Sequence, residues 1–410
     1  MSQPVAAPKK VNLRTPDVMS AVQAQVESHY RSELVEYARH SSGGILTAGD
    51  LTVRLAKAFG FCYGVERAID LAYASAKVFP NKKIYLLGEI IHNPEVNHQL
   101  RELGIHSLKE EKEGYDLNFI TADDVVIVPA FGAEVKTMDV LKAKGCQIVD
   151  TTCGDVMSVY KRVRQYSREK VTSIIHGKAW HEETKATSSR ALSEDGSSHY
   201  LVVFNLEETD YVCDYIRKGG NKEEFLKKFE GCHSVGFDPD LHLKDVGVAN
   251  QTTMLRGETE EVQRRIQKAI DDRYGSVEAP KHFRFFDTIC GATQERQDAL
   301  EHLLKQPLDL LLVVGGYNSS NTTHLAEMGE SLLPTYFIKN SDQLISEENI
   351  SHYNLHEKKE IITSNWLPKG KVTVGVTAGA SCPNNIIEST IRRLFFLRGI
   401  SVENLIPKAS

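Results

Sequence analysis

The chain has 410 residues, 41% of them hydrophobic and 25% charged, which is typical of a globular protein with two to four domains. A net charge of -6 without a long basic run gives no electrostatic reason to expect nucleic acid as a partner. No apolar stretch approaches the roughly 20 residues that a membrane span requires, so we expect no membrane span and no secretory signal segment.

Residues 1–50 are predicted to form an N-terminal extension, with one helix near Ala21–Ala38 and a loop at Ser41–Gly44. From Leu51 onward, strands and helices alternate along the chain. Alternation of this kind is typical of an α/β fold whose parallel strands are buried on both faces. We therefore predict an α/β protein with mainly parallel sheets.

Three similar α/β units are predicted at residues 51–153, 154–286 and 287–397, followed by a tail at 398–410. The predicted strands are the run that ends at Cys62, Ile84–Ile91, Val125–Phe131, Ile148–Cys153, Val171–Gly177, Tyr200–Phe204, Val246–Thr253, Phe283–Cys290, Leu308–Gly316, Thr335–Lys339 and Val372–Ser381. The predicted helices are Val65–Phe79, one from Pro94, Val156–Lys170, one from Glu182, Gln294–Lys305 and Ile386–Leu397.

Three cysteines, Cys62, Cys153 and Cys290, occupy the same place in this repeated order, at the end of an extended run and before a helix. A polar loop ends the next strand at nearly the same distance each time, 30, 28 and 29 residues further on. Ligands gather at the carboxyl ends of parallel strands, where N–H groups of the following helices point outward. We therefore predict a pseudo-threefold trefoil in which the three thiolates converge at the centre.

Three thiolates suit a soft metal centre, chiefly zinc or an iron-sulfur cluster. Structural zinc usually takes four ligands with a close Cys-x-x-Cys pair, and the absence of such a pair from the sequence favours a cluster. A cubane cluster held by three cysteines leaves one iron able to bind a substrate oxygen. The alternative is that the cysteines are small buried apolar residues, which is our interpretation of the four outside the repeat, Cys146, Cys213, Cys232 and Cys382.

The polar loops carry His92, His181 and the run Ser319-Ser320-Asn321 at equivalent positions. Imidazole, hydroxyl and amide donors beside helix N-termini are what a phosphate or diphosphate requires. Glu183 follows His181 by two residues; beside a diphosphate its pKa should rise, so that it could serve as a general acid. Thr252 ends a strand and could position a proton. The alternatives are a helix-start glutamate favoured by the helix dipole and an ordinary turn threonine.

Several longer motifs occur in order along the chain: GFCYGVERAI around Cys62, EIIHNP, DTTCGDV around Cys153, NQTT, DTICGATQERQDA around Cys290, VVGGYNSSNTTHLAE and VTAGASCP. Together they resemble the 4-hydroxy-3-methylbut-2-enyl diphosphate reductases, the IspH/LytB family of the non-mevalonate isoprenoid pathway, over about Arg54 to Leu397. The resemblance implies a three-domain trefoil around a central 4Fe-4S cluster. It also implies reductive dehydroxylation of an allylic diphosphate, by two electrons and two protons, to isopentenyl diphosphate and dimethylallyl diphosphate.

The resemblance implies a role for each motif residue. Cys62, Cys153 and Cys290 would bind the cluster, while Glu183, with Thr252 and His181, would deliver the proton that lets the hydroxyl leave as water. The residues that would hold the diphosphate are His92, His181, Thr252, Ser319, Ser320, Asn321 and Ser381. A ferredoxin or flavodoxin would supply electrons, since no GxGxxG dinucleotide fingerprint occurs in the sequence.

The chain departs from the commoner family pattern at two motifs. Phe131 in PAFGAEV stands where many members have a histidine, so one diphosphate donor is absent or replaced, a change that a longer-chain branch of the family shares. KAWHEETKAT stands where many members read HPEVEGT, but the separation of His181 and Glu183 is kept. The insertion Tyr211–Asp245, rich in Lys and Glu, also fits the longer branch and is predicted to be solvated surface.

Two other functions stay open from the sequence. An iron-sulfur hydro-lyase acting on a hydroxy acid would favour arginines in the loops, whereas the loops offer His, Ser and Asn. A non-enzymatic iron or redox sensor would have no need of Glu183. Seven cysteines without an export signal are typical of a reducing compartment, which predicts the cytoplasm, or the plastid stroma for a processed or plant-type chain.

Overall fold

The computed structural model describes residues 11–111, 114–286 and 288–402, which belong to two compact units. The central unit, named for its place in the sequence, comprises Asn81–Gly88 and His106–Cys290. The terminal unit comprises Val11–Pro80, Glu89–Ile105 and the described part of Gly291–Ser410. No described helix combines the length and the apolar character that crossing a bilayer requires.

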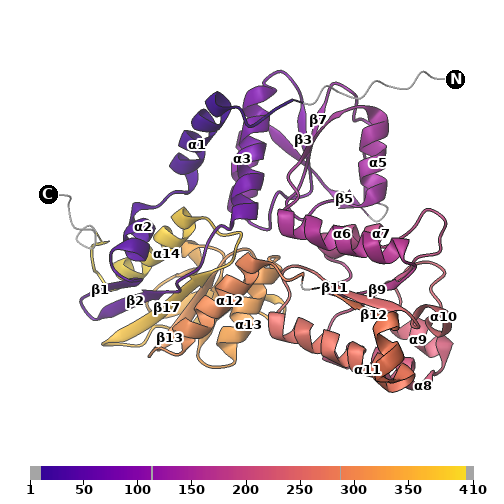
Figure 1. Ribbon diagram of the computed structural model, residues 1–410. Helices are drawn as coiled ribbons and strands as arrows, with labels where there is room; N and C mark the ends of the chain where they lie inside the picture. The colour runs from indigo at the N-terminus through magenta and orange to yellow at the C-terminus, as the bar shows by residue number, and fades with distance from the viewer. Residues whose placement is uncertain (1–10, 112–113, 287, 403–410) are drawn as a thin grey trace. The chain divides into compact units, whose positions relative to one another are not determined.

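Two four-stranded sheets form the central unit (Figure 1). The strand order of the first is β4 (Ile105–Leu108), β3 (Ile84–Leu87), β7 (Val125–Val128) and β8 (Gln147–Asp150), and that of the second is β10 (Tyr200–Val203), β9 (Thr172–His176), β11 (Val246–Asn250) and β12 (Phe283–Phe285). Pairing is parallel from β3 to β8 and throughout the second sheet. Every residue of β7, β9 and β11 is buried, as expected for parallel strands covered on both faces.

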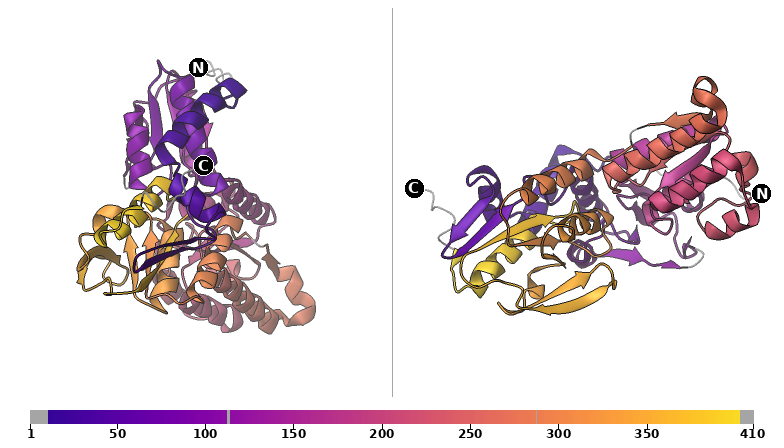
Figure 2. Two further views of the ribbon diagram at one scale, coloured as in Figure 1. Left: turned by 90° about the vertical axis from the view of Figure 1, so that its left-hand side faces the viewer. Right: turned by 90° about the horizontal axis from the view of Figure 1, so that it is seen from below.

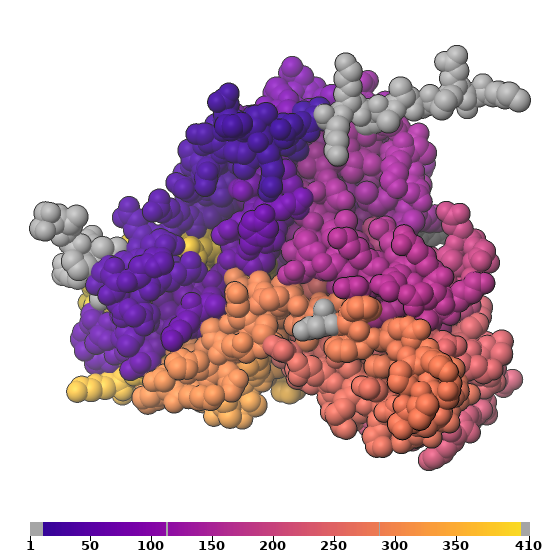
Figure 3. All heavy atoms as spheres, in the orientation of Figure 1, coloured from indigo at the N-terminus to yellow at the C-terminus, as the bar shows by residue number. Residues whose placement is uncertain are grey.

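The insertion Tyr211–Asp245 contributes to a hydrophobic core, so its prediction as solvated surface was wrong in part. The charged residues face outward, but Phe225 and Phe229 are almost fully buried. They pack with helix α8 (Leu206–Lys218) and with α11 (Arg256–His282), a long helix that the sequence analysis did not identify. Gly275 has a φ of 75° and kinks α11, whose outer residues form part of the surface in Figure 3.

The remaining helices of the central unit follow its strands in sequence. They are α5 (Val135–Lys144), α6 (Gly154–Arg168), α7 (Glu182–Arg190), α9 (Lys222–Lys228) and α10 (Pro239–His242). Helices α6 and α7 contact each other, and α6 also contacts β9 and β11. This packing holds the loops after β7, β9 and β11 next to one another.

One seven-stranded sheet forms most of the terminal unit. Its order is β1 (Ile45–Ala48), β2 (Leu51–Leu55), β17 (Val372–Ala378), β13 (Leu310–Val314), β14 (Thr335–Ile338), β15 (Asn349–Asn354) and β16 (Lys359–Ser364). The strands from β2 to β14 are parallel, and antiparallel pairs close both edges. The hairpin of β15 and β16, which was not predicted, lies at one edge (Figure 2).

The helices of the terminal unit come from both ends of the sequence. They are α1 (Pro16–Tyr30), α2 (Glu33–His40), α3 (Tyr63–Val78), α4 (Pro94–Glu102), α12 (Gly291–Leu304), α13 (Ser320–Glu330) and α14 (Asn384–Leu397). Helix α12 packs beside α13, and α14 contacts α2. Of the predicted tail at 398–410, only the residues up to 402 lie within the described part of the chain.

The predicted N-terminal extension is part of the terminal unit rather than an appendage. Two helices, α1 and α2, replace the single predicted one, since the chain turns at Arg31 and Ser32, whose hydroxyl caps α2 by accepting from the N–H of Val35. Leu34 and Leu46 are buried in the core of the seven-stranded sheet. Strand β1 extends that sheet by pairing antiparallel with β2.

The strands that precede the three repeat cysteines each lie in a different sheet. Strand β8, before Cys153, pairs with β7 of the first sheet, and β12, before Cys290, pairs with β11 of the second. Strand β2, before Cys62, pairs with β17 of the third sheet. The sequence grouped Leu51–Leu55 with residues up to 153, and strand pairing corrects this. The predicted fold class, α/β with three mainly parallel sheets, is confirmed.

Candidate functional site

The three repeat cysteines lie in equivalent turns between a strand and a helix. Cys62 and Cys153 are the N-cap residues of α3 and α6, and Cys290 directly precedes α12. The backbone N–H of Cys153 donates to the carbonyl of Ala130 at 2.8 Å, and that of Cys62 to the carbonyl of Ala380 at 3.3 Å. Thiolate charge is stabilised at such positions by the helix dipole.

The four other cysteines have the surroundings predicted for small apolar residues. Cys146, Cys213 and Cys382 are buried, and Cys232 is half-buried. Burial raises the pKa of Cys213 to about 12 and also raises the pKa of the three other thiols. These groups stay neutral thiols at physiological pH and are poor metal ligands.

Glu183 is a buried carboxylate whose two oxygens both accept from Thr252. The backbone N–H of Thr252 donates to Oε1 of Glu183 at 2.6 Å, and the Thr252 hydroxyl donates to Oε2 at 3.0 Å. Only 2% of Glu183 is exposed. The two hydrogen bonds satisfy both oxygens of this buried side chain and fix its orientation.

His181 is the N-cap residue of α7, next to Glu183 in sequence and space. Its Nδ1 accepts the backbone N–H of Glu183 at 3.1 Å, which assigns the ring proton of the neutral form to Nε2. The ring is 8% exposed. The structure thus brings His181, Glu183 and Thr252 together.

Gln251 fixes this arrangement and was not singled out from the sequence, although it stands in the quoted NQTT motif. Its Oε1 accepts from the N–H of Lys178 at 3.1 Å and from the hydroxyl of Thr184 at 3.2 Å. Its Nε2 donates to the hydroxyl of Thr253 at 2.8 Å. This buried amide joins the loop after β9, helix α7 and the end of β11, and so fixes Thr252 relative to Glu183.

Phe131 lies against His181 in an edge-to-face contact, with ring centroids 6.3 Å apart. The carbonyl of Phe131 accepts from the Tyr160 hydroxyl at 3.1 Å. Gly132 must be glycine, since an added Cβ would lie 2.0 Å from that hydroxyl. The aromatic ring that replaces the family's common histidine thus orients His181 through packing instead of offering a hydrogen-bond donor.

The loop of His92 packs tightly against the glycines of VVGGY in the terminal unit. Nδ1 of His92 lies 3.1 Å from a carboxylate oxygen of Glu89, which stabilises a proton on that nitrogen. An added Cβ at Gly316 would lie 2.3 Å from the carbonyl oxygen of His92. The glycine therefore permits two loops from distant parts of the sequence to meet, next to a cavity of about 240 Å³ that Lys339 also lines.

Hydroxyls and one amide connect the YNSSN and TAGAS loops. The Ser381 hydroxyl lies 3.3 Å from that of Ser319 and 3.4 Å from the carbonyl oxygen of His92. Oδ1 of Asn321 accepts the backbone N–H of Ala380 at 3.0 Å. Because Ala380 also accepts from the N–H of Cys62, this network places the Cys62 turn beside the serine loops.

Two buried polar groups at the start of α13 lack partners among the described residues. They are the hydroxyl of Ser320 and the Nδ2 of Asn321. Unpaired buried donors are costly, and at a helix N-terminus they suit an anion. The terminal unit thus brings together, in one cluster of loops, Cys62, His92, Ser319, Ser320, Asn321 and Ser381.

In the central unit, two repeat cysteines lie in turns next to the Glu183 group. The backbone N–H of Cys153 donates to the carbonyl of Ala130. The next residue, Phe131, contacts the ring of His181. The turn before Cys290 is anchored by the hydroxyl of Thr288, which donates to Oδ1 of Asn250 at the end of β11. Thr252 follows two residues after the end of β11.

Comparison with known proteins gives one family. The model of the LytB protein family matches residues 53–395. A Gloeobacter violaceus protein named 4-hydroxy-3-methylbut-2-enyl diphosphate reductase is 49% identical over 384 residues, which cover 92% of this chain and 90% of that protein. A Nostoc relative with the same name is 48% identical, with 92% of each chain covered.

Two solved structures are similar in fold. One, titled as (E)-4-hydroxy-3-methyl-but-2-enyl diphosphate reductase, the terminal enzyme of the non-mevalonate pathway, is 28% identical, with a TM-score of 0.51 over 83% of this chain and 98% of that one. The reductase from Plasmodium falciparum has a TM-score of 0.61 at 21% identity, over 85% of this chain and 89% of that one. The second likeness concerns the fold alone.

Proposed function

The chain belongs to the LytB protein family, and we propose that it reduces 4-hydroxy-3-methylbut-2-enyl diphosphate in the non-mevalonate isoprenoid pathway. The substrate's allylic carbon–oxygen bond breaks, two electrons and two protons enter, and the hydroxyl leaves as water. The products are isopentenyl diphosphate and dimethylallyl diphosphate, according to which end of the allyl unit receives the second proton. Glu183, a buried carboxyl with two hydrogen bonds from Thr252, is the observation that best supports this chemistry.

Glu183 acts as the proton source for the departing hydroxyl. Hydroxide is a poor leaving group, so a carboxyl that protonates it lowers the activation barrier. The reaction rate typically rises by a factor of about 10² to 10⁴. Substrate phosphate oxygens raise the proton affinity of a nearby carboxylate. Thr252 then orients the carboxyl, and His181 donates through Nε2 to the anionic end of the substrate.

The loop cluster of the terminal unit holds the diphosphate. The hydroxyl of Ser320 and the amide of Asn321 are unsatisfied donors among the described residues, and the helix α13 begins there. Ser319, Ser381 and His92 complete the set of neutral and charge-assisted donors. A diphosphate would satisfy the buried groups and gain the favourable end of the helix dipole.

Cys62, Cys153 and Cys290 supply the ligands of an iron-sulfur cluster. Each thiol lies at a helix N-terminus where thiolate charge is stabilised, and each directly follows an extended segment that leads into its helix. Three sulfur donors without a nitrogen or oxygen ligand fit such a cluster. When bound, a 4Fe-4S cluster supplies single electrons and an iron with an open coordination position.

A one-electron carrier of the ferredoxin or flavodoxin type delivers the electrons in this proposal. In this reaction the Glu183 group supplies the proton and the diphosphate loops hold the phosphates of the same substrate. The cytoplasm is the proposed location, or the plastid stroma for a plant-type chain.

The decisive experiment compares Glu183→Gln with Glu182→Gln after anaerobic purification. With chemically reduced carrier and the allylic diphosphate, we expect Glu183→Gln to lose about a hundredfold or more in kcat, while Glu182→Gln keeps wild-type turnover. The iron and sulfide content of both variants should equal that of the wild type. Full turnover by Glu183→Gln would refute the proton-source role, and absence of turnover in the wild type would refute the function.

A further inference from the structure

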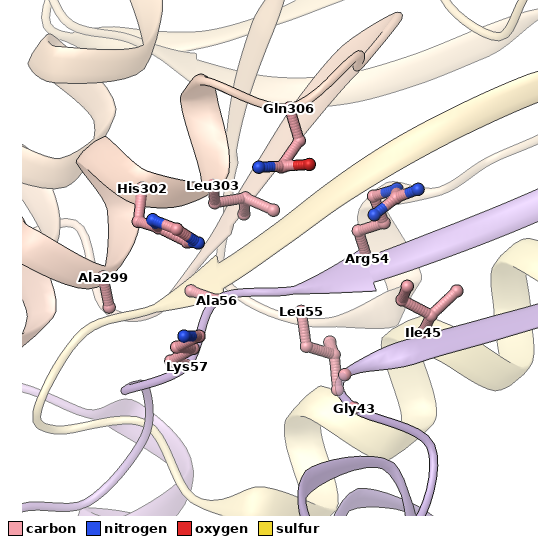
Figure 4. A pocket seen from close by; sticks show the side chains of 11 residues that line it. Gly43, Ile45, Arg54, Leu55, Ala56, Lys57, Ala299, His302, Leu303 and Gln306 are labelled. Atoms are coloured by element: carbon pink, nitrogen blue, oxygen red, sulfur yellow. The ribbon is translucent and has the colours of Figure 1, made fainter.

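We propose that a basic pocket in the terminal unit binds a phosphate-type oxyanion. The pocket lies between strand β2, the turn at Gly43 and Gly44, and the C-terminal end of α12 (Figure 4). Figure 4 shows Arg54 on β2, with His302 and Gln306 on the opposite wall and Lys57 below them in the view. The cavity has a volume of about 180 Å³.

The charges of this pocket are all of one sign. Arg54, Lys57 and His302 carry the titratable side chains that line it, and none of its lining residues, all of which are described, is acidic. This is unexpected on a chain with a net charge of -6. Cationic groups that converge without a carboxylate raise the local potential and attract anions.

Arg54 is the strongest indication of a missing ligand. Its Nε is buried and has no hydrogen-bond partner within the described part of the chain. A buried donor of a charged group that is left unpaired destabilises the folded protein. An oxyanion seated on the guanidinium would remove that cost, since guanidinium N–H groups bind two oxygens of one phosphate or carboxylate in parallel.

Strand register places Arg54 beside a glycine. Arg54 is the partner of Gly375 on β17 and of Ile45 on β1. Paired residues point to the same face of a sheet, so β17 has no side chain at the position paired with Arg54. Leu308 and Leu311 fill the space over this glycine, since an added Cβ there would lie 2.8 Å from Cδ1 of Leu308 and 3.1 Å from Cδ1 of Leu311. Leucine side chains contain no hydrogen-bond acceptor, so they offer the Nε of Arg54 no partner.

The donors fit a phosphoryl group best. The donors of the pocket come from different directions, which suits a tetrahedral anion with several charges. They are the guanidinium of Arg54, the ammonium of Lys57, the ring of His302 and the amide of Gln306. None of the residues that line the pocket belongs to the loops assigned above to the substrate or the cluster. The inference therefore does not depend on the proposed reductase function.

Calorimetric titration of the full chain with inorganic phosphate, and separately with inorganic pyrophosphate, tests the proposal. The variants are Arg54→Gln and, as matched control, Lys305→Gln, which removes a nearby positive charge that is paired with Glu301 outside the pocket. We expect one binding site to weaken by about tenfold or more in Arg54→Gln and to persist in Lys305→Gln. Binding should also weaken as salt is raised.

Pyrophosphate bound at the loops around Ser319 contributes equally in all three proteins, so the difference between them reports on this pocket. Preference for pyrophosphate over phosphate would identify a diphosphate compound as the ligand class, and equal affinities would identify free phosphate. Equal titrations of Arg54→Gln and the wild type would overturn the proposal. Because the readout is binding, loss of reductase activity cannot produce a false result, and circular dichroism checks that Arg54→Gln is folded.

Discussion

Thr252 donates to both carboxylate oxygens of Glu183, through its backbone N–H at 2.6 Å and through its hydroxyl at 3.0 Å. The two residues lie 69 positions apart in the sequence. The turn after strand β11 supplies Thr252 and helix α7 supplies Glu183, so the pairing depends on how these elements pack. The orientation of the Glu183 carboxylate therefore depends on the Thr252 hydroxyl.

Replacement of Thr252 by valine should lower kcat by about tenfold, because a hydrogen bond to a charged group is lost while the backbone N–H bond stays. Thr252→Ser keeps the hydroxyl and should retain most of the activity. Steady-state kinetics of both variants provide the measurement. Equal activity in the two variants would show that the hydroxyl does not matter.

Replacement of Cys153 by serine should reduce the iron and sulfide bound per chain, since oxygen is a poorer ligand for a cluster than thiolate. Cys232→Ser is the control, because that thiol lies outside the three strand-to-helix turns. Iron and acid-labile sulfide assays with electron paramagnetic resonance, with and without the allylic diphosphate, give the readout. A full cluster in Cys153→Ser, or its loss in Cys232→Ser, would contradict the ligand assignment.

An alanine at Gly316 should separate the loops of His92 and Tyr317, because the new Cβ would lie 2.3 Å from a backbone oxygen. We expect a loss of about 1–3 kcal/mol in unfolding free energy and a raised KM for the diphosphate. Gly257→Ala is the matched control, as an added Cβ there has no neighbour within 4 Å. Thermal unfolding and kinetics check both effects, and unchanged values in Gly316→Ala would mean that the loops do not need this contact.

The histidine pair His199 and His242 should make folding stability fall in acid. Their rings stack at 3.7 Å, burial and the neighbouring ring lower the pKa of His199, and burial lowers the pKa of His242. Below the unfolded value of about 6.5 the unfolded chain therefore binds protons that the folded chain does not, so stability falls as pH drops. The measurement is urea unfolding at several pH values between about 7.5 and 5.5, a range that brackets the pKa of an unfolded histidine.

His242→Gln should flatten this pH dependence, whatever its effect on stability at neutral pH. His356→Gln, at an exposed histidine, should leave the slope as in the wild type. A slope that is equal in His242→Gln and the wild type would assign the acid sensitivity to other groups.

Much of the secondary structure could be predicted from local pattern. The buried apolar runs of β7, β9 and β13 and the helices after the repeat cysteines have strong periodicity, and the predicted ranges overlap the observed ones. Helix α11 escaped notice because it is highly charged on its outer face. Phe225 and Phe229 were hidden for the same reason, since charged neighbours outnumber them in a stretch whose apolar face only becomes evident against α11.

The sequence by itself determined the repeat of three cysteines, the types of donor in each loop and the family resemblance that the comparisons confirm. Tertiary structure decided that Leu51–Leu55 pairs with β17 in the seven-stranded sheet. It also decided that Thr252 donates two hydrogen bonds to Glu183. Tertiary packing further decided that Arg54, whose buried Nε has no partner among the described residues, lines a pocket with Lys57 and His302. A motif consists of residues that are close in sequence, so it can be recognised without a structure. Strand partners and hydrogen bonds between distant segments arise from packing, which local pattern does not encode.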